Sequence, residues 1–334
     1  MKKHKICKIL LVILAIFLCV AFYELLGICV AYKKQPEVSN TTKKETKNGS
    51  WNECSENTER AVIIEKNPEA LLQRVRLIKN AKKEIILSTF AFQSDESGKL
   101  ILGALHDAAD RGVHIRLLVD GMESWIDMEG NPYFYGLSSH ENVEIKLYNK
   151  ANPLKPWKMM GRMHDKYLIA DGKRYILGGR NTYNYFLGDF PGHKNYDRDV
   201  LVVCDEPEKE NSVNQLLEYF ETIWEQEDSG YFHDNKKLAN RKSVKNAVLE
   251  LQNGYQKYFE ENKERICDTD YTDETFETEK IALVSNPIHT GSKEPVVWYQ
   301  LGELMKNAKN RVKIHTPYII CNDMMYNTWK EIAE

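Results

Sequence analysis

The segment from Gly161 to Asn181 carries the side chains best suited to chemistry in this sequence; it reads GRMHDKYLIADGKRYILGGRN. We expect a strand over residues 163–170, in which His164 and Lys166 face the same side about 7 Å apart. A neutral imidazole beside a fixed ammonium suits attack on a phosphodiester, because the histidine nitrogen can be the nucleophile while the lysine neutralises developing oxyanion charge. The pattern predicts phosphoryl-transfer chemistry.

Further positions in the segment fit this chemistry. Asn181 can add a neutral hydrogen-bond donor to the phosphate oxygens, and Gly178 and Gly179 before it allow the backbone to approach closely. Asp171 follows His164 by seven residues, which is about 23 Å along an extended strand. We therefore expect Asp171 to fix a hairpin turn rather than to touch the reacting phosphate.

The spacing H-x-K-x4-D-x6-G-G-x-N resembles the signature of the phospholipase D superfamily at every fixed position. The resemblance extends over about Ala61 to Trp224, and over the start of a second copy from about Lys280. It implies a fold of two similar α/β/α lobes that each give one motif to a central site. One histidine then forms a phosphohistidine and the other protonates the leaving alcohol, with no metal and no cofactor.

The resemblance also assigns roles to individual residues. His164 is the expected nucleophile, and Lys166 and Asn181 bind the phosphate. A downstream carboxylate orients the histidine; Asp197 and Asp199 share a strand face, and we prefer Asp197. With the fixed aspartate of the motif, the expected catalytic set is His164, Lys166, Asp171, Asn181 and Asp197.

A second H-x-K is missing from the sequence before Glu334, so the chain as given holds half of such a site. We expect the other motif from a missing C-terminal half of the protein, or, as the less favoured alternative, from a homodimer.

The sequence after the motif, Gly-Gly-Arg-Asn with an aromatic-rich loop and Asp-x-Asp-Val, most resembles bacterial cardiolipin synthases and related phosphatidyltransferases. This resemblance implies a phospholipid substrate and a bilayer partner, and no nucleic acid. The loop aromatics either contact acyl chains or pack within the lobe; they are Tyr183, Tyr185, Phe186 and Phe190. Residues just before the motif suit a membrane-facing rim: Lys155, Trp157, Lys158, Met159 and Met160.

Two other classes of function stay open. One is a phosphodiesterase that acts on nucleic acid with the same histidine chemistry. The other is a non-catalytic lipid-binding or scaffold protein with a degraded second lobe. A second H-x-K-x4-D near residue ~390, by the repeat offset, would favour an enzyme.

Short β-branched runs alternate with helical periodicity through the body, which predicts an α/β layered fold around a largely buried sheet. The expected helices cover about 67–83, 98–111 and 207–225. The expected strands cover 84–90, 113–119, 143–148, 163–170, 174–177 and 199–203.

The N-terminal stretch from Ile9 to Tyr32 is apolar apart from Glu24 and one glycine. Its helical length of about 36 Å is enough to cross a hydrocarbon core of ~30 Å. Lysines flank it on both sides. We expect a retained single-pass anchor in the cell membrane, with a cleaved signal peptide as the alternative and a weak preference for a body outside the cytoplasm.

An internal repeat sets the domain organisation. Residues 77–90 match residues 304–317 at an offset of 227, with Lys-Asn-Ala-Lys in both copies. We expect a duplicated helix and strand, and a chain that is a fragment because the second copy is incomplete. The expected parts are an anchor (1–34), a flexible tether (35–60), a first phospholipase D-like lobe (61–226), a strand-free charged connector with surface helices (227–279) and the start of a second lobe (280–334).

The composition is that of a globular protein, with 42% hydrophobic residues and 46 Lys+Arg against 49 Asp+Glu. The net charge of −3 excludes a binder that relies on bulk positive charge. Seven cysteines without metal-type spacing predict neither a disulfide scaffold nor a metal site.

Overall fold

One mixed sheet of nine strands forms the centre of the structure, a computed structural model that describes residues 2–48, 59–207, 210–233, 235–316 and 319–333. The strand order is β8-β4-β3-β2-β5-β6-β7-β1-β9. Strands β2, β3 and β4 run parallel, and all other neighbours pair antiparallel. The strands are β1 (Arg60–Ile64), β2 (Glu84–Thr89), β3 (His114–Asp120), β4 (Val143–Tyr148), β5 (Tyr167–Ala170), β6 (Arg174–Gly178), β7 (Asp199–Val203), β8 (Ser229–Tyr231) and β9 (Phe276–Glu277).

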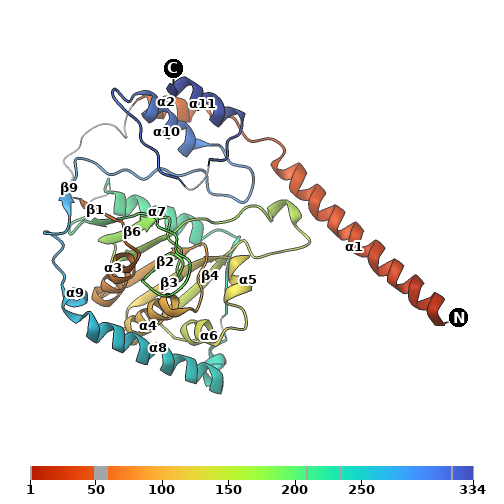
Figure 1. The fold of residues 1–334 in the computed structure, drawn as a ribbon, viewed down its shortest axis with the longest axis horizontal. Coiled ribbons are helices and arrows are strands. Elements are labelled where there is room, and N and C mark those ends of the chain that lie inside the picture. The colour runs from red at the N-terminus through yellow and green to blue at the C-terminus, as the bar shows by residue number, and fades with distance from the viewer. Residues whose placement is uncertain (1, 49–58, 208–209, 234, 317–318, 334) are drawn as a thin grey trace.

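Helices cover both faces of this sheet (Figure 1). One face is covered by α3 (Asn67–Asn80), α4 (Glu96–Asp110), α6 (Pro132–Ser138) and α8 (Lys242–Glu261), and the other by α7 (Ser212–Trp224). Successive side chains of a strand point to opposite faces of the sheet. In β2, Ile85 and Leu87 pack in the core under α3 and α4, and Ile86 packs in the core under α7. The predicted α/β sandwich is confirmed.

The expected connector, residues 227–279, is part of this domain and supplies both edges of its sheet. β8 pairs with β4 at one edge and β9 pairs with β1 at the other. α8 packs closely on α4, since a side chain at Gly103 would collide with Leu251 and Tyr255. The prediction of a strand-free connector is wrong, because strands of three and two residues are too short to show an alternating pattern.

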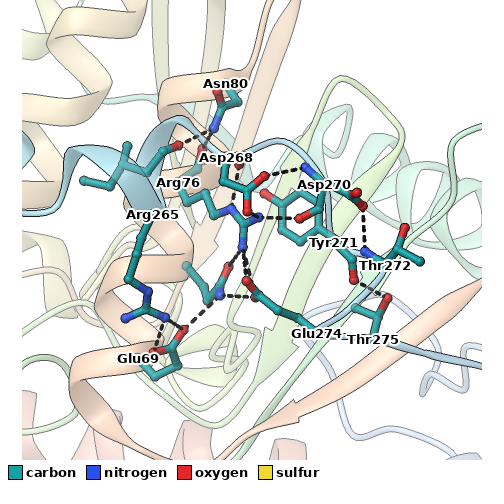
Figure 2. A network of polar contacts seen from close by, with 12 residues as sticks. Glu69, Arg76, Asn80, Arg265, Asp268, Asp270, Tyr271, Thr272, Glu274 and Thr275 are labelled. Carbon is teal, nitrogen blue, oxygen red and sulfur yellow. Dashed lines mark hydrogen bonds and ion pairs between the residues drawn. The ribbon is translucent and has the colours of Figure 1, made fainter.

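A buried arginine on α3 holds the end of this connector in place (Figure 2). The Arg76 guanidinium donates to the carbonyls of Asp268 (2.8 Å) and Asp270 (2.7 Å) and pairs with the carboxylate of Glu274 (2.9 Å). It also lies 3.9 Å from the ring centroid of Tyr271. Its donors are thus satisfied although only 1% of the residue is exposed.

The expected flexible tether contains a helix. Residues Asn40–Lys47 form α2, with the Ser39 hydroxyl accepting a hydrogen bond from the backbone of Thr42. Glu294, far along the chain, accepts hydrogen bonds from the Ser39 backbone (2.8 Å) and the Thr42 hydroxyl (2.6 Å). The prediction of a flexible segment is therefore wrong for 40–47, where the fixing contacts are non-local, and residues 49–58 lie outside the described residues.

The expected second copy forms its helices but not its strand. α10 (Val296–Lys306) ends one residue before the position that matches the end of α3, and α11 (Asp323–Ala333) begins where the offset of 227 from Glu96 places it. Residues 311–316, which match β2, have no strand pairing. The matching helices support the repeat, and the expected strand is not formed.

One helix among the described residues is long and apolar enough to cross a membrane; it runs from Lys5 to Tyr32 within α1 (Lys2–Tyr32). Figure 1 shows α1 projecting away from the body. Its C-terminal part contacts the body, where the Tyr23 hydroxyl donates to the Leu154 carbonyl (3.1 Å) and the Tyr32 hydroxyl donates to that of Thr290 (2.6 Å).

Candidate active site

The motif residues lie at the ends of β2 and β5, but not on the strand that the sequence predicts. β5 begins at Tyr167, so His164 and Lys166 precede it in an irregular segment. The Lys166 ammonium turns back and donates to the His164 carbonyl (2.6 Å), and Lys166 is buried while His164 is exposed. The expected shared strand face is wrong, although the two side chains remain neighbours.

The end of β2 gathers the three predicted phosphate-handling residues. The His164 ring lies 4.8 Å from the Phe90 ring, and the Lys166 nitrogen lies 5.4 Å from the centroid of the same ring. The buried Asn181 accepts a hydrogen bond from the backbone of Ala91 (3.2 Å) through its amide oxygen. This bond fixes the amide orientation and leaves its NH2 group as the donor that a phosphate needs.

The glycine pair of the motif makes room for two carboxylates. A side chain at Gly178 would collide with Asp199, and one at Gly179 would collide with Asp197. The Gly178 backbone also donates to the Lys166 carbonyl (3.1 Å), which ties the end of β6 to the motif lysine. Both glycines are therefore required by close packing.

The two candidate orienting carboxylates differ in their surroundings. Asp199 is fully buried and pairs with two buried arginines, Arg74 (2.9 Å) and Arg180 (3.2 Å). Asp197 is half-buried, accepts from the Arg198 backbone (2.7 Å) and lies near enough to Lys166 to raise its pKa. Among the described residues, neither carboxylate hydrogen-bonds to the His164 ring, so the choice of Asp197 stays a prediction.

Asp171 lies at the opposite end of β5 from the motif histidine. It adopts a left-handed conformation (φ 55°) in the β5–β6 turn. Its carboxylate accepts hydrogen bonds from the backbones of Lys82 (2.9 Å), Lys83 (2.7 Å) and Glu84 (3.0 Å). These bonds tie the hairpin to the start of β2 and place Asp171 away from the other motif residues.

Burial and charge shift the protonation of both motif bases in useful directions. Although the residue is exposed, partial desolvation of its ring and the neighbouring Lys166 charge lower the pKa of His164, against an opposing effect of Asp120, so its imidazole is mainly neutral at pH 7. Burial lowers the pKa of Lys166 to about 8, although Asp165 and Asp197 oppose the shift. At neutral pH the pair therefore combines a neutral nucleophile with a cation.

Sequence reasoning missed several residues that support the site. Asp120, at the end of β3, accepts from the Arg162 side chain (2.9 Å) and the Met163 backbone (3.1 Å), which fixes the chain just before His164. Asp165 accepts from the Tyr219 hydroxyl (2.8 Å), and burial raises the pKa of this carboxyl. The sequence did contain a signal for this region. Asp120 is the last residue of β3 and Phe90 directly follows β2, and functional sites commonly lie at the C-terminal ends of parallel strands.

The loop aromatics after the motif pack within the lobe. Phe186 is buried in the core below α3 and α4, and Tyr183, Tyr185 and Phe190 pack against that core. Of the two alternatives for these residues, the structure favours lobe packing over contact with acyl chains.

Comparisons with known proteins relate this chain to a described family. Residues 74–224 match the family described as cardiolipin synthase, phospholipase D-like domain. An uncharacterized protein of Helicobacter pylori strain 26695 is 28% identical over 81% of this chain and 56% of its own length, and cardiolipin synthase C of Escherichia coli K12 is 29% identical over 47% and 34%. The NucT structure from H. pylori has a TM-score of 0.41 at 17% identity, covering 52% of this chain and 99% of that one.

The fold and the motif thus define an α/β domain of the phospholipase D type. Residues 74–224 belong to the phospholipase D superfamily. The chain spans about half the length of the H. pylori relative.

Proposed function

We propose that this protein is a membrane-anchored phosphodiesterase or phosphatidyltransferase that acts on phospholipids through a phosphohistidine at His164. The observation that carries the proposal is the gathering of a neutral His164, a cationic Lys166 and an oriented Asn181 amide around the end of β2. These are the groups needed to attack phosphorus and to bind its oxygens.

In the proposed first step the neutral nitrogen of His164 attacks phosphorus. The N–P bond forms as the P–O bond to the leaving alcohol breaks, and that oxygen takes a proton from the second histidine expected of the superfamily. Lys166 and Asn181 stabilise the charge on the non-bridging oxygens, and Asp197 orients His164. Water or an alcohol then attacks phosphorus, the N–P bond breaks, and the acceptor's proton returns to the second histidine.

Two observations support a phospholipid substrate. The apolar helix α1 gives the chain a candidate anchor in the bilayer that holds the substrate. The match to the cardiolipin synthase domain and the similarity to cardiolipin synthase C point to the same substrate class. Single-pass anchoring in the cell membrane is part of the proposal.

The test is turnover of labelled phosphatidylglycerol vesicles by the natural full-length protein, with acid quenching to trap a phosphoenzyme. His164→Asn should abolish turnover and the acid-labile adduct, because it removes the attacking nitrogen. His114→Asn is the matched control, since His114 begins β3 at the other end of the sheet. A phosphoenzyme that persists in His164→Asn would assign the nucleophile to the second motif.

The alternative substrate is tested in the same preparation with single- and double-stranded DNA. Cleavage of DNA without lipid turnover, lost in His164→Asn, would establish the nucleic-acid phosphodiesterase instead. Absence of turnover on lipid and DNA by a folded full-length protein would favour the non-catalytic class.

A further inference from the structure

Exposed apolar side chains gather on the loop that leads into the catalytic motif. This loop contains the short helix η1 (Pro156–Lys158), and its Leu154 is 78% exposed. A second group lies on α5 (Glu123–Asp127), where Trp125 is 70% exposed. We call the following residues the apolar rim: Trp125, Ile126, Leu154, Trp157 and Met160.

The two parts of the apolar rim are held next to each other by the sheet. α5 follows β3 and the loop follows β4, two parallel neighbours whose ends meet at one edge. A side chain at Gly121 would collide with the Lys150 backbone, so the two connections touch. The ion pair of Asp120 with Arg162 (2.9 Å) also links β3 to the end of the loop.

The loop is fixed to α1 near the body end of that helix. The Tyr23 hydroxyl donates to the Leu154 carbonyl (3.1 Å), and a side chain at Gly27 would collide with Pro156. The tyrosine thus satisfies a backbone carbonyl at the exposed tip of the loop. An irregular segment in contact with lipid needs such internal hydrogen bonds, because no water is present there to bond its backbone groups.

The length of α1 sets the depth of this contact. The 28-residue apolar segment is longer than the hydrocarbon core, since it extends about 42 Å against ~30 Å. If Lys8 marks the far surface, Tyr23 lies about 8 Å along the axis inside the near boundary of the hydrocarbon; if Lys33 marks the near surface, the distance is about 15 Å. In both cases the tip of the loop lies within the near leaflet, between the headgroups and the bilayer midplane.

Exposed lysines lie close in sequence to the apolar rim and to the end of α1. Lys33 and Lys34 follow α1, and Lys150 and Lys155 flank Leu154. Exposed apolar side chains with lysines nearby are typical of protein surfaces that insert into anionic bilayers.

We propose that the apolar rim inserts into the leaflet around α1 and binds anionic phospholipid there, so that the exposed His164, four residues after Met160, faces the headgroup layer. The inference rests on the proposed anchoring by α1. In this proposal the loop and α5 bind the membrane independently of α1, and the ligand of the apolar rim is lipid.

Tryptophan fluorescence tests the insertion without need of activity. All six tryptophans lie outside α1, so quenching by brominated lipid reports only the body of the protein. With the full chain in phosphatidylglycerol-containing vesicles, Trp157→Phe should remove a large part of the quenching by lipid brominated in the acyl chains. Trp224→Phe, which changes a buried core residue, should remove little.

Equal quenching in the wild type and in Trp157→Phe would overturn the proposal. Protection of Trp157 from both brominated lipid and aqueous acrylamide would also overturn it, because another protein surface would then cover the apolar rim. Quenching by phosphatidylcholine alone to the same extent would contradict the role of anionic lipid.

A kinetic measurement on two substrates distinguishes failure of this inference from failure of the proposed function. In Leu154→Asp/Trp157→Asp, turnover of vesicle phospholipid should fall about ten- to a hundredfold, as expected when two apolar anchors lose their burial. Turnover of the water-soluble diester bis(p-nitrophenyl) phosphate should be unchanged, which also shows that the variant is folded. Equal loss on both substrates would contradict docking, whereas an inactive wild type would count against the proposed function and leave the quenching result valid.

Discussion

β2 and the matching residues 311–316 have related sequences and different structures. β2 lies between two partners, β3 on one side and β5 on the other, and it is buried on both faces. Residues 311–316 are mostly exposed and belong to no strand of the sheet, although α10 and α11 on either side occupy the positions that the repeat predicts. A helix satisfies its backbone within one segment, whereas a strand depends on neighbours from elsewhere in the chain.

The same contrast applies to the polar contacts that fix the two regions. In the lobe, Arg76 is buried and joins α3 to residues 268–274. In the C-terminal segment, Lys306 makes partly exposed ion pairs with Glu303 and Glu331 on α10 and α11. Buried charges that lose their partners are costly, and exposed pairs contribute little.

The largest effect is expected from Arg76→Ala. Its removal takes the buried guanidinium away from two backbone carbonyls and from the Glu274 carboxylate, which keeps the hydrogen bond from Gln73, so the free energy of unfolding should fall by about 3 kcal/mol. Lys306→Ala should cost at most about 1 kcal/mol. Urea unfolding followed by circular dichroism measures both, and similar losses in the two variants would mean that the connector is not fixed as Figure 2 shows.

Next comes the functional difference between the motif lysine, Lys166, and an exposed lysine of the C-terminal segment, Lys313. Lys166→Ala should reduce turnover by about 10²–10³, the effect of losing one group that stabilises oxyanion charge. The matched control is Lys313→Ala, an exposed lysine two residues from His315 in the C-terminal segment. Steady-state rates of the full-length protein measure both, and a comparable loss in Lys313→Ala would bring the C-terminal segment into the site.

Asp171→Asn should act on stability rather than on catalysis. The change weakens three backbone hydrogen bonds that tie the hairpin to β2, and it should cost about 1–3 kcal/mol. Asparagine tolerates the left-handed backbone, which limits the loss to the carboxylate. Unfolding and turnover are measured together below the melting range; a stable but inactive variant would show that Asp171 acts in the reaction.

The sequence predicted the lobe well where its signals are local. Short β-branched runs located β2, β3, β4, β6 and β7, and the motif spacing located the residues around Phe90. It failed for β8 and β9, which are strands only because β4 and β1 lie beside them. It also failed for the conformation of His164 and Lys166, since the turn of the Lys166 side chain depends on the buried surroundings of β2.

The pH dependence of turnover should report the charge of Lys166. Because burial lowers its pKa to about 8, its cationic form is lost as the pH rises through this value, and turnover at pH 9 should be about tenfold below that at pH 7. His164 has a lowered pKa, so turnover should fall on the acid side only below the usual range of histidine. Lys166→Arg keeps its charge at these pH values and should lose the alkaline fall; an unchanged alkaline limb would assign it to another group.

The smallest effect tests the contrast between β2 and its repeat directly. Ile314 matches Leu87 at the offset of 227, and it is 50% exposed where Leu87 is 3% exposed. Ile314→Asp should therefore change the free energy of unfolding by no more than about 0.5 kcal/mol, whereas Leu87→Asp should cost more than about 4 kcal/mol by burying an unpaired charge. The measurement is urea unfolding of this 334-residue chain. A large loss in Ile314→Asp would show that residues 311–316 are buried, and the contrast between a strand inside the sheet and a copy outside it would fail.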